Sequence, residues 1–353
     1  MDFRNKKLSI GIIYVGIIVV LSLLGLFYNI GSIVSTVDSK VFITLGIYYS
    51  FYLLLTLPLD FVFSNELNNE KDHSIKKIFL FNFLLFIIFY TSGVLLYFVL
   101  INNSFIYLII YSLIMQILLL IIQNLVMRFF FIKNQKEYSG LEVLELKDSP
   151  KYMTSNIIYG VFSKCILIPE HWLLENTENY NFHLKRIFIM CKNKIFIKVL
   201  LVSAFLNTIV LTTAIYIAKD YYIDNIELII NLSLLFNLVC FIYILLLPKL
   251  SQWGVMNIDN IMKKDNIEIY KKNLEIFEKN QDKNNQINQN IESIFYPIPS
   301  VNTRIKNQKN FSLTFPNISR TIIFMMMFGA SIILKGVHGN AGKPENWIFP
   351  PTE

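Results

Sequence analysis

Long apolar runs separated by polar stretches are the dominant pattern along this chain. Several of them approach the length at which a helix, rising about 1.5 Å per residue, crosses a hydrocarbon core of about 30 Å. They lie at residues 8–30, 42–63, 78–101, 104–127, 199–218, 227–248 and 319–335, and the last is the shortest. The pattern predicts a polytopic α-helical membrane protein with about seven transmembrane helices.

The first apolar segment follows three basic residues, Arg4, Lys6 and Lys7, as a secretory signal peptide would. Its apolar region is too long for a signal peptide, and no small-x-small cleavage site stands out after it. We therefore interpret this segment as an uncleaved membrane anchor.

The first of two polar stretches, residues 133–198, has the pattern of a small α/β domain. Apolar and charged residues alternate over 141–146, as in a half-buried strand. Two short apolar runs, 157–162 and 165–168, are spaced as in a hairpin. From Trp172 onward, apolar residues recur at helical spacings of three and four. This stretch predicts a small antiparallel sheet followed by a helix.

The second polar stretch, residues 249–318, mixes charges with apolar residues at imperfect helical spacing, which predicts amphipathic helices. Its low-complexity centre, 279–286, is too polar to bury apolar surface and predicts a flexible connection. Two interpretations of the helices stay open. They either pack on the first polar domain or dock to a cytoplasmic partner or the membrane surface.

These patterns give a domain organisation of alternating membrane and polar parts. The expected parts are a four-helix transmembrane region (1–132), a cytoplasmic domain (133–198), two transmembrane helices (199–248), a cytoplasmic helical and flexible segment (249–318), a last transmembrane helix (319–335) and an extracellular tail (336–353).

Composition and charge refine this topology. Hydrophobic residues make up 54% of the chain and charged residues only 16%. With the N-terminus inside, all but four of the 32 Lys and Arg residues fall in cytoplasmic loops, as the positive-inside rule requires. The exceptions are Lys40, Lys219, Lys335 and Lys343. We therefore expect a cytoplasmic N-terminus and an extracytoplasmic C-terminus.

The net charge of +7 does not indicate a nucleic-acid partner, because the basic residues are spread over several loops and form no single stripe. The high content of Asn, Lys and Ile is typical of AT-rich bacterial genomes. The expected location is a bacterial cytoplasmic membrane.

Four short segments occur in an order that carries a family resemblance. They are Ser149-Pro150, 159–162 (Tyr-Gly-Val-Phe), 166–170 (Ile-Leu-Ile-Pro-Glu) and a helix that ends in the basic run 192–198. In this order and between apolar segments, they resemble the membrane-embedded BlaR/MecR-type metallopeptidases, a family of antibiotic-sensing antirepressor proteases. The resemblance implies a gluzincin-like fold for the first polar domain.

In that family, the strand ending in Pro-Glu is followed by a helix with a His-Glu-x-x-His motif, which supplies two zinc ligands and a general base. The degenerate motif in this chain has Lys185, Arg186, Ile189 and Met190 in that place. Two His residues at i and i+4 share one helical face and one zinc ion, so their replacement removes the metal site. We expect a pseudoprotease with no catalytic, cofactor-binding or metal-binding residues.

The chain has only four histidines, namely His73, His171, His183 and His338. The closest two, His171 and His183, are 12 residues apart. Together with Glu170 or Glu175 they leave an atypical membrane metalloprotease open as an alternative.

The tail ends in a cluster of Trp347, Ile348 and Phe349 before Pro350. Exposed aromatic residues before prolines can form a recognition epitope, so this cluster is a candidate interaction site. The alternative is that the aromatic residues touch lipid headgroups or belong to a frayed end. Members of the family commonly have a large external ligand-binding domain, whereas 18 residues follow Lys335 in this sequence, so we do not expect antibiotic sensing.

The expected function is that of a noncatalytic regulatory, sensing or assembly subunit. Its partners would be another membrane or cytoplasmic protein and the lipid bilayer. The alternative is a membrane transport or immunity-type protein. Transporters keep costly ionisable residues in their spans, whereas these spans contain almost none except Asp60.

Overall fold

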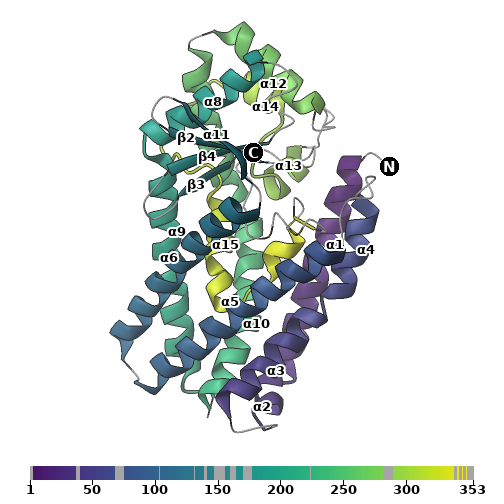
Figure 1. Cartoon of the computed structure of the whole chain (residues 1–353), viewed down its shortest axis with the longest axis vertical. Coiled ribbons are helices and arrows are strands. Elements are labelled where there is room, and N and C mark those ends of the chain that lie inside the picture. Colours follow the sequence, from purple (N-terminus) through teal and green to yellow (C-terminus); the bar gives the residue numbers. More distant parts are fainter. Residues whose placement is uncertain are drawn as a thin grey trace. The chain divides into compact units, whose positions relative to one another are not determined.

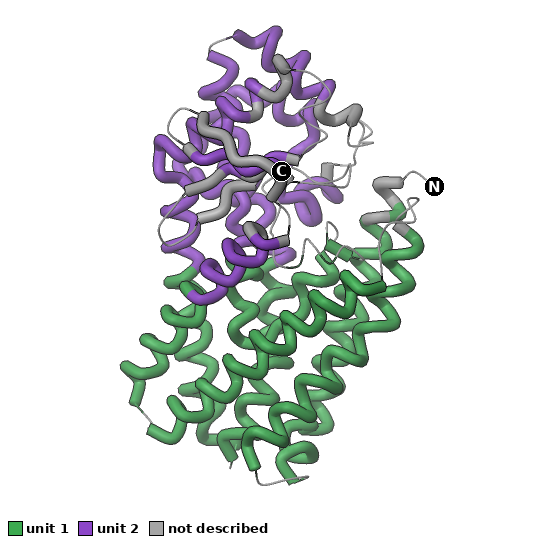
Figure 2. Tube along the Cα trace, viewed as in Figure 1, with its two compact units in different colours: residues 1–117, 204–243, 322–349 green, residues 118–203, 244–321, 350–353 purple. Residues whose placement is uncertain are grey.

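The computed structural model describes most of the chain. The described residues are 3–36, 40–67, 75–102, 104–130, 132–138, 141–146, 156–159, 164–169, 177–222, 224–264, 266–280, 289–337, 340, 341, 344 and 347. The chain divides into two compact units (Figure 2). Unit 1 comprises residues 1–117, 204–243 and 322–349, and unit 2 comprises residues 118–203, 244–321 and 350–353.

Apolar α-helices build unit 1 (Figure 1). The helices that contribute to it are α1 (Phe3–Phe27), α2 (Ile30–Ser35), α3 (Val41–Leu54), α4 (Leu57–Leu67), α5 (Ile75–Ile101), α6 (Phe105–Phe130), α9 (Ile195–Ala218) and α10 (Asn225–Leu246). Among the described residues, six helices are long and apolar enough to cross a membrane, with α3 and α4 together forming one of them. Many of their large apolar side chains point outward, such as Phe27, Phe205 and Phe51, which are 81%, 65% and 60% exposed. This is the architecture of a multi-pass helical membrane protein.

The stretch 319–335, predicted as a seventh transmembrane helix, does not form one continuous helix. This stretch is broken into α15 (Ile318–Met325) and two 3-10 helices, η1 (Met326–Gly329) and η2 (Ile333–Gly336). Ala330 separates the two 3-10 helices with a left-handed φ of 60°. The apolar composition of this stretch is typical of a membrane-spanning helix, but its backbone forms three short helical pieces instead of one long helix.

Contacts inside unit 1 show that the chain turns back on itself here. The carbonyl oxygen of Phe328 accepts a hydrogen bond from Ser92 on α5. Seven residues later, the ammonium of Lys335 lies 3.0 Å from Oδ1 of Asn82, which precedes Ser92 by ten residues on the same helix. Ten helical residues span about 15 Å, so the chain from Phe328 to Lys335 runs along α5 in the direction opposite to that helix. We call residues 322–337 the re-entrant segment.

Unit 2 contains a four-stranded sheet with the order β1-β2-β4-β3. Its strands are β1 (Ile132–Tyr138), β2 (Leu141–Leu146), β3 (Asn156–Tyr159) and β4 (Lys164–Pro169). The predicted strand at 141–146 is confirmed, and β3 and β4 pair as the predicted hairpin. Two features differ from the prediction. Strand β1 is not among the predicted strands. Strand β2 pairs with β4 in parallel, so the sheet is mixed and not antiparallel as predicted.

Helices of both polar stretches pack together in unit 2. They are α8 (Thr177–Lys192), α11 (Pro248–Lys263), α12 (Ile267–Asn280), α13 (Gln289–Phe295) and α14 (Val301–Lys306). One core cluster joins Val143 and Ile166 of the sheet with Leu184 of α8 and Ile258 of α11. The amphipathic helices therefore bury their apolar faces on the first polar domain, as one of the two interpretations predicted. Most of the predicted flexible connection at 279–286, namely residues 281–286, lies outside the described residues.

We expect the substitution Gly329→Ala to destabilise the protein. A methyl group at this position would overlap the ring of the fully buried Phe236, so one of the two must move. Overpacking of this kind typically costs about 1–3 kcal/mol. Thermal unfolding in detergent would measure the loss. Gly16→Ala is the matched control, because its added methyl group meets nothing within 4 Å, and equal melting temperatures of the two variants would contradict the proposed close packing.

Candidate functional site

The most unusual feature of unit 1 is an ion pair in its interior. Asp60 lies in the first turn of α4, and Lys335 belongs to η2 at the end of the re-entrant segment. Nζ of Lys335 is 2.6 Å from Oδ2 of Asp60, and at most 2% of either side chain is exposed. Charged groups inside an apolar helix bundle are costly, so their presence points to a specific role.

A break between two helices places Asp60 in the interior. Helix α3 ends at Leu54, and α4 begins at Leu57, with a two-residue turn at Leu55 and Thr56 between them. The hydroxyl of Thr56 donates to the carbonyl oxygen of Leu53 and accepts a 2.7 Å hydrogen bond from Lys335. The turn thus supplies one ligand of the ammonium directly.

Polar side chains complete the surroundings of both charges. Tyr14 of α1 donates a 2.6 Å hydrogen bond to Oδ1 of Asp60, and Asn82 donates a 3.2 Å hydrogen bond to Oδ2. The ammonium of Lys335 donates to Asp60, Thr56 and Oδ1 of Asn82. An ammonium has three N–H donors, so all its donors have an acceptor. We call Tyr14, Thr56, Asp60, Asn82 and Lys335 the polar clasp.

Trp347 from the tail lies against the polar clasp. Its ring centroid is 4.5 Å from Nζ of Lys335, a distance typical of a cation–π contact. The indole N–H donates to the carbonyl oxygen of Asn340 at 3.0 Å, and Asn340 itself donates to the carbonyl oxygen of Leu334. The prediction of an exposed Trp347 is wrong, because this side chain is fully buried. The other three candidates of the tail, Ile348, Phe349 and Pro350, lie outside the described residues.

A second polar contact ties the re-entrant segment to α1 and α3. The amide nitrogen of Asn237, on α10, donates to Oγ of Ser22 at 2.9 Å and to the hydroxyl of Tyr52 at 2.6 Å. Its amide oxygen accepts hydrogen bonds from the hydroxyl of Ser331 and the backbone N–H of Ile332, both at 3.0 Å. One buried side chain therefore connects three elements of unit 1 with the turn of the re-entrant segment.

In unit 2, the residues of the degenerate motif lie on α8. Lys185 is exposed, Ile189 is half-buried, and Met190 is buried in the core with the sheet. Arg186 is buried, and its Nε lies 3.3 Å from Oδ1 of Asp259 on α11. Arg186 is therefore a buried cation beside a carboxylate.

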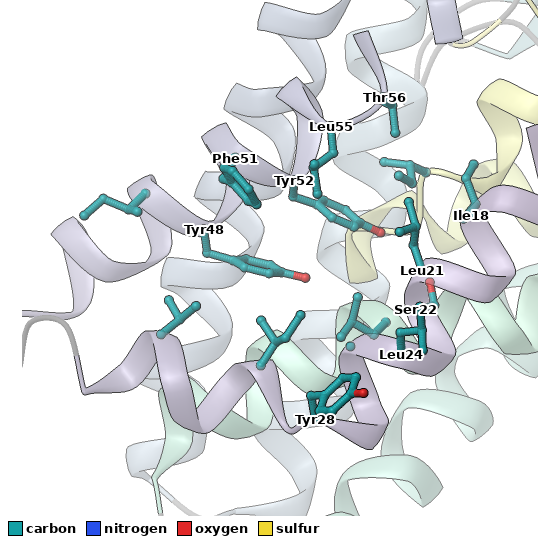
Figure 3. Close-up of a pocket in the computed structure, with 16 residues that line it drawn as sticks. Ile18, Leu21, Ser22, Leu24, Tyr28, Tyr48, Phe51, Tyr52, Leu55 and Thr56 are labelled. Atoms are coloured by element: carbon teal, nitrogen blue, oxygen red, sulfur yellow. The ribbon is translucent and has the colours of Figure 1, made fainter. Parts of the chain in front are cut away.

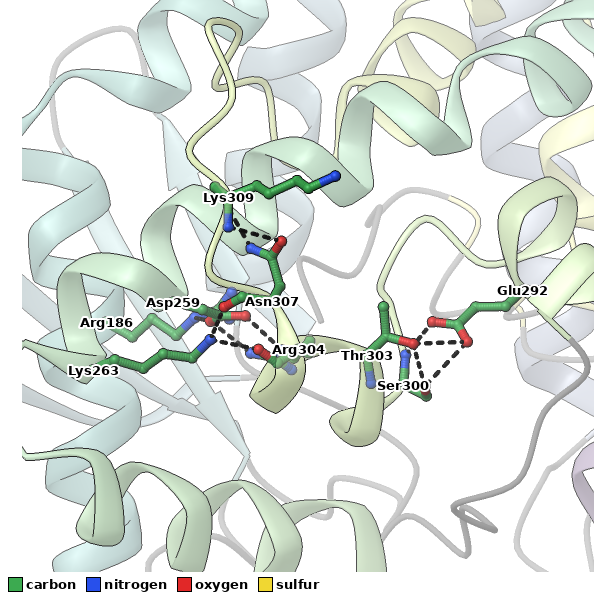
Figure 4. A network of polar contacts seen from close by, with 9 residues as sticks. All are labelled: Arg186, Asp259, Lys263, Glu292, Ser300, Thr303, Arg304, Asn307 and Lys309. Carbon is green, nitrogen blue, oxygen red and sulfur yellow. Dashed lines mark hydrogen bonds and ion pairs between the residues drawn. The ribbon is translucent and has the colours of Figure 1, made fainter.

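Asp259 binds a second arginine more closely (Figure 4). Nε of Arg304 lies 2.7 Å from Oδ2, and Nη2 lies 2.9 Å from Oδ1, which is the bidentate geometry of a strong pair. Burial lowers the pKa of Arg186 to about 10, with the charge of Arg304 acting in the same direction and Asp259 opposing it. Burial would raise the pKa of Asp259, but the two guanidinium groups outweigh it and hold this pKa below its usual value.

Helix α14, which carries Arg304, is held at both ends. Nζ of Lys263 donates to the carbonyl oxygens of Arg304 and Asn307 at 2.6 and 2.7 Å. At the other end, the carboxylate of Glu292 accepts hydrogen bonds from the backbone N–H and the hydroxyl of Ser300, at 2.7 and 3.0 Å (Figure 4). This short helix therefore keeps Arg304 in place beside Asp259.

No group of three or more His, Cys, Asp or Glu residues that could hold a metal ion occurs within the part of the chain that the structure describes. Of the histidines, His73, His171 and His338 lie outside that part, as does Glu170, and the side chain of His183 is not described. The alternative metal site at His171 and His183 therefore stays a prediction.

Neither the scan against protein-family models nor the search of curated proteins finds a match for this chain. The resemblance to BlaR/MecR-type metallopeptidases consequently stays a prediction that rests on the order of short motifs.

The sequence analysis missed most of the polar clasp. Asp60 stood out as an ionisable residue in a span, but Lys335 was assigned to the opposite side of the membrane. The sequence feature that indicates this pair is an acidic residue in one apolar segment together with a basic residue at the end of another. Opposite charges in apolar segments tend to pair, because each alone is costly in hydrocarbon.

We expect Lys335→Met to destabilise the protein by about 3–5 kcal/mol, because it leaves the buried carboxylate of Asp60 without its counter-ion. The double variant Asp60→Leu/Lys335→Met removes both charges and should unfold close to the wild-type temperature. Thermal unfolding in detergent compares the two. A double variant as unstable as the single one would show that charge compensation is not what matters at this position.

The cluster in unit 2 gives a parallel expectation. Asp259→Asn leaves two buried guanidinium groups uncompensated, which should cost about 3–5 kcal/mol. Urea unfolding followed by the fluorescence of Trp253, which stacks on Phe311, would measure it. Glu66→Gln is the control, since Glu66 forms an exposed pair with Lys6 that should contribute less than about 1 kcal/mol.

The same cluster should make stability depend on pH. Because the pKa of Asp259 is lower in the folded state than its usual value, its contribution is fully present above about pH 4 and is lost as the pH falls through the folded-state pKa. Wild-type protein should therefore lose more stability on acidification than Asp259→Asn. Identical pH profiles would contradict this assignment.

Proposed function

We propose that this chain is a noncatalytic regulatory or sensing subunit of a bacterial cytoplasmic membrane, in which the polar clasp holds the re-entrant segment in a resting position. The observation that carries the proposal is the ion pair between Asp60 and Lys335 in the interior of an apolar helix bundle. A release of the segment would then be the event that a partner protein detects.

The energetics of buried charges favour a switch over a purely stabilising role. Apolar residues of similar size often stabilise a core as well as a buried ion pair or better, because the two charges lose their hydration. A buried pair that is fully hydrogen-bonded is, however, stable in one arrangement and costly in partly opened ones. These properties suit an element that must have two distinct states.

The noncatalytic part of the proposal rests on α8. Where the resembled family has its zinc ligands and general base, this chain has Lys185, Arg186 and Ile189, and Arg186 is paired with Asp259. A guanidinium cannot act as a base at neutral pH. In this proposal, unit 2 contains a cytoplasmic, gluzincin-like domain that binds a partner and does not cleave it.

A transport function is the second candidate, and the same ion pair favours it, because ionisable residues in membrane spans often mark ion paths. The three donors of Lys335 and both carboxylate oxygens of Asp60 are already engaged by side chains of the polar clasp, which agrees better with a closed contact in the resting state than with an open ion path. Solute flux into liposomes containing the purified protein would favour transport.

Mass spectrometry of proteins that copurify with the tagged chain from its native membrane tests the proposed function. We expect a stoichiometric partner that recognises the released segment. Lys335→Met, which frees the segment, should then increase the amount of copurified partner, whereas Asp60→Leu/Lys335→Met, which holds it by apolar packing, should decrease it. Lys6→Met is the control, because Lys6 belongs to an exposed pair. A protein that copurifies with no partner in any variant would contradict a regulatory subunit.

The re-entrant segment also changes the expected topology. With six crossings and a cytoplasmic N-terminus, we place the C-terminus on the cytoplasmic side, in contrast to the extracytoplasmic tail that seven crossings imply. A green fluorescent protein fused after residue 353 should therefore fluoresce, because it folds only in the cytoplasm. A fusion after Ile101, between α5 and α6, is the dark control. A dark C-terminal fusion with normal expression would restore the seventh crossing.

A further inference from the structure

Unit 1 contains a pocket of about 370 Å³ among α1, α2 and α3 (Figure 3). Its inner wall includes Ser22 and Thr56, which are each 1% exposed. Its outer wall includes Leu24 and Phe51, which are 46% and 60% exposed. The pocket therefore extends from the outer surface of the helix bundle into its interior.

The surface that the pocket presents is apolar, although hydroxyl groups occur in its wall. The hydroxyls of Ser22 and Tyr52 accept hydrogen bonds from Asn237, and that of Tyr48 is bonded to Oγ of Ser233. With these polar groups engaged, the contacts left for an occupant are mainly with aliphatic and aromatic carbon. An empty apolar cavity is destabilising roughly in proportion to its volume, so an apolar occupant would stabilise the fold.

The position of the pocket limits what the occupant can be. Its exposed wall residues belong to helices long and apolar enough to cross a membrane, so the medium at its opening is hydrocarbon. We propose that this pocket binds the hydrocarbon chain of a long-chain amphiphile. The hydrocarbon chain enters between α1 and α3, and its end lies beside Thr56 and Ile332.

This position connects the occupant with the re-entrant segment. Ile332 lines the pocket and donates its backbone N–H to Asn237, while Thr56 lines the pocket and accepts a hydrogen bond from Lys335. A bound hydrocarbon chain therefore contacts Ile332 and Thr56, two residues whose hydrogen bonds hold the re-entrant segment in place. Resting on the proposed function, we assign the bound hydrocarbon chain the role of the signal that the subunit detects.

Photolabelling tests the binding site. The purified protein is reconstituted into vesicles of phosphatidylglycerol and phosphatidylethanolamine that contain a phospholipid with a diazirine in its acyl chain. A second sample receives a free diazirine fatty acid. We expect adducts on the peptides around Leu21 and Tyr52 that decrease in the presence of excess unlabelled lipid, as at a saturable site. Labelling by the phospholipid identifies a bilayer lipid as the source, and labelling by the fatty acid alone identifies a diffusible amphiphile.

Two variants that fill the pocket provide the critical comparison. Leu21→Trp and Ile47→Trp place an indole at partly exposed wall positions, which tolerate added bulk, and each should lower labelling about tenfold. Leu23→Trp is the matched control, because Leu23 is 51% exposed on the same helix and does not line the pocket. Equal labelling of all exposed apolar faces, or equal loss in the control, would overturn the proposal. Labelling uses purified protein without a partner, so its failure is distinguishable from failure of the copurification experiment.

Discussion

The buried pair of Asp60 and Lys335 is the constraint on which the arrangement of unit 1 depends. Neither charge is stable alone in an apolar bundle, so the segments that carry and surround them must meet at one place. Tyr14 fixes the position of α1 along α4, and Asn82 fixes that of α5. Hydrophobic packing alone would allow these apolar helices to slide along each other at little cost, whereas hydrogen bonds to one carboxylate define their register.

Unit 2 is organised by the same principle in a different setting. Asp259 is a single buried carboxylate between two guanidinium groups, and it joins α8, α11 and α14. In both units, a central charged side chain is hydrogen-bonded by residues that are distant in sequence. Asn237 is the uncharged counterpart in unit 1, since one amide accepts and donates at the same time. Polar contacts thus determine which elements meet, and apolar burial supplies most of the stabilisation.

The apolar runs correctly predicted the long helices, and apolar residues interrupted by Glu142 and Glu145 predicted the strand at 141–146, because both patterns are local. Strand β1 (Ile132–Tyr138), which the sequence analysis does not predict, has no such pattern and depends on pairing with β2. Hydropathy also cannot distinguish a crossing from a re-entrant segment, since both are apolar. The reversal depends on Gly329 fitting against Phe236 and on the left-handed Ala330. Likewise, the partner of Lys335 is 275 residues away, so no local pattern contains it.

That separation has a consequence for how the protein is made. Asp60 leaves the ribosome 275 residues before Lys335 does. Until then, Tyr14 and Asn82 are the nearby groups that can donate to the carboxylate, and no counter-ion is present. A chain that stops before Lys335 keeps an uncompensated charge in its interior. The lysine therefore completes the charge balance of the interior only after the segments that surround Asp60 have been made.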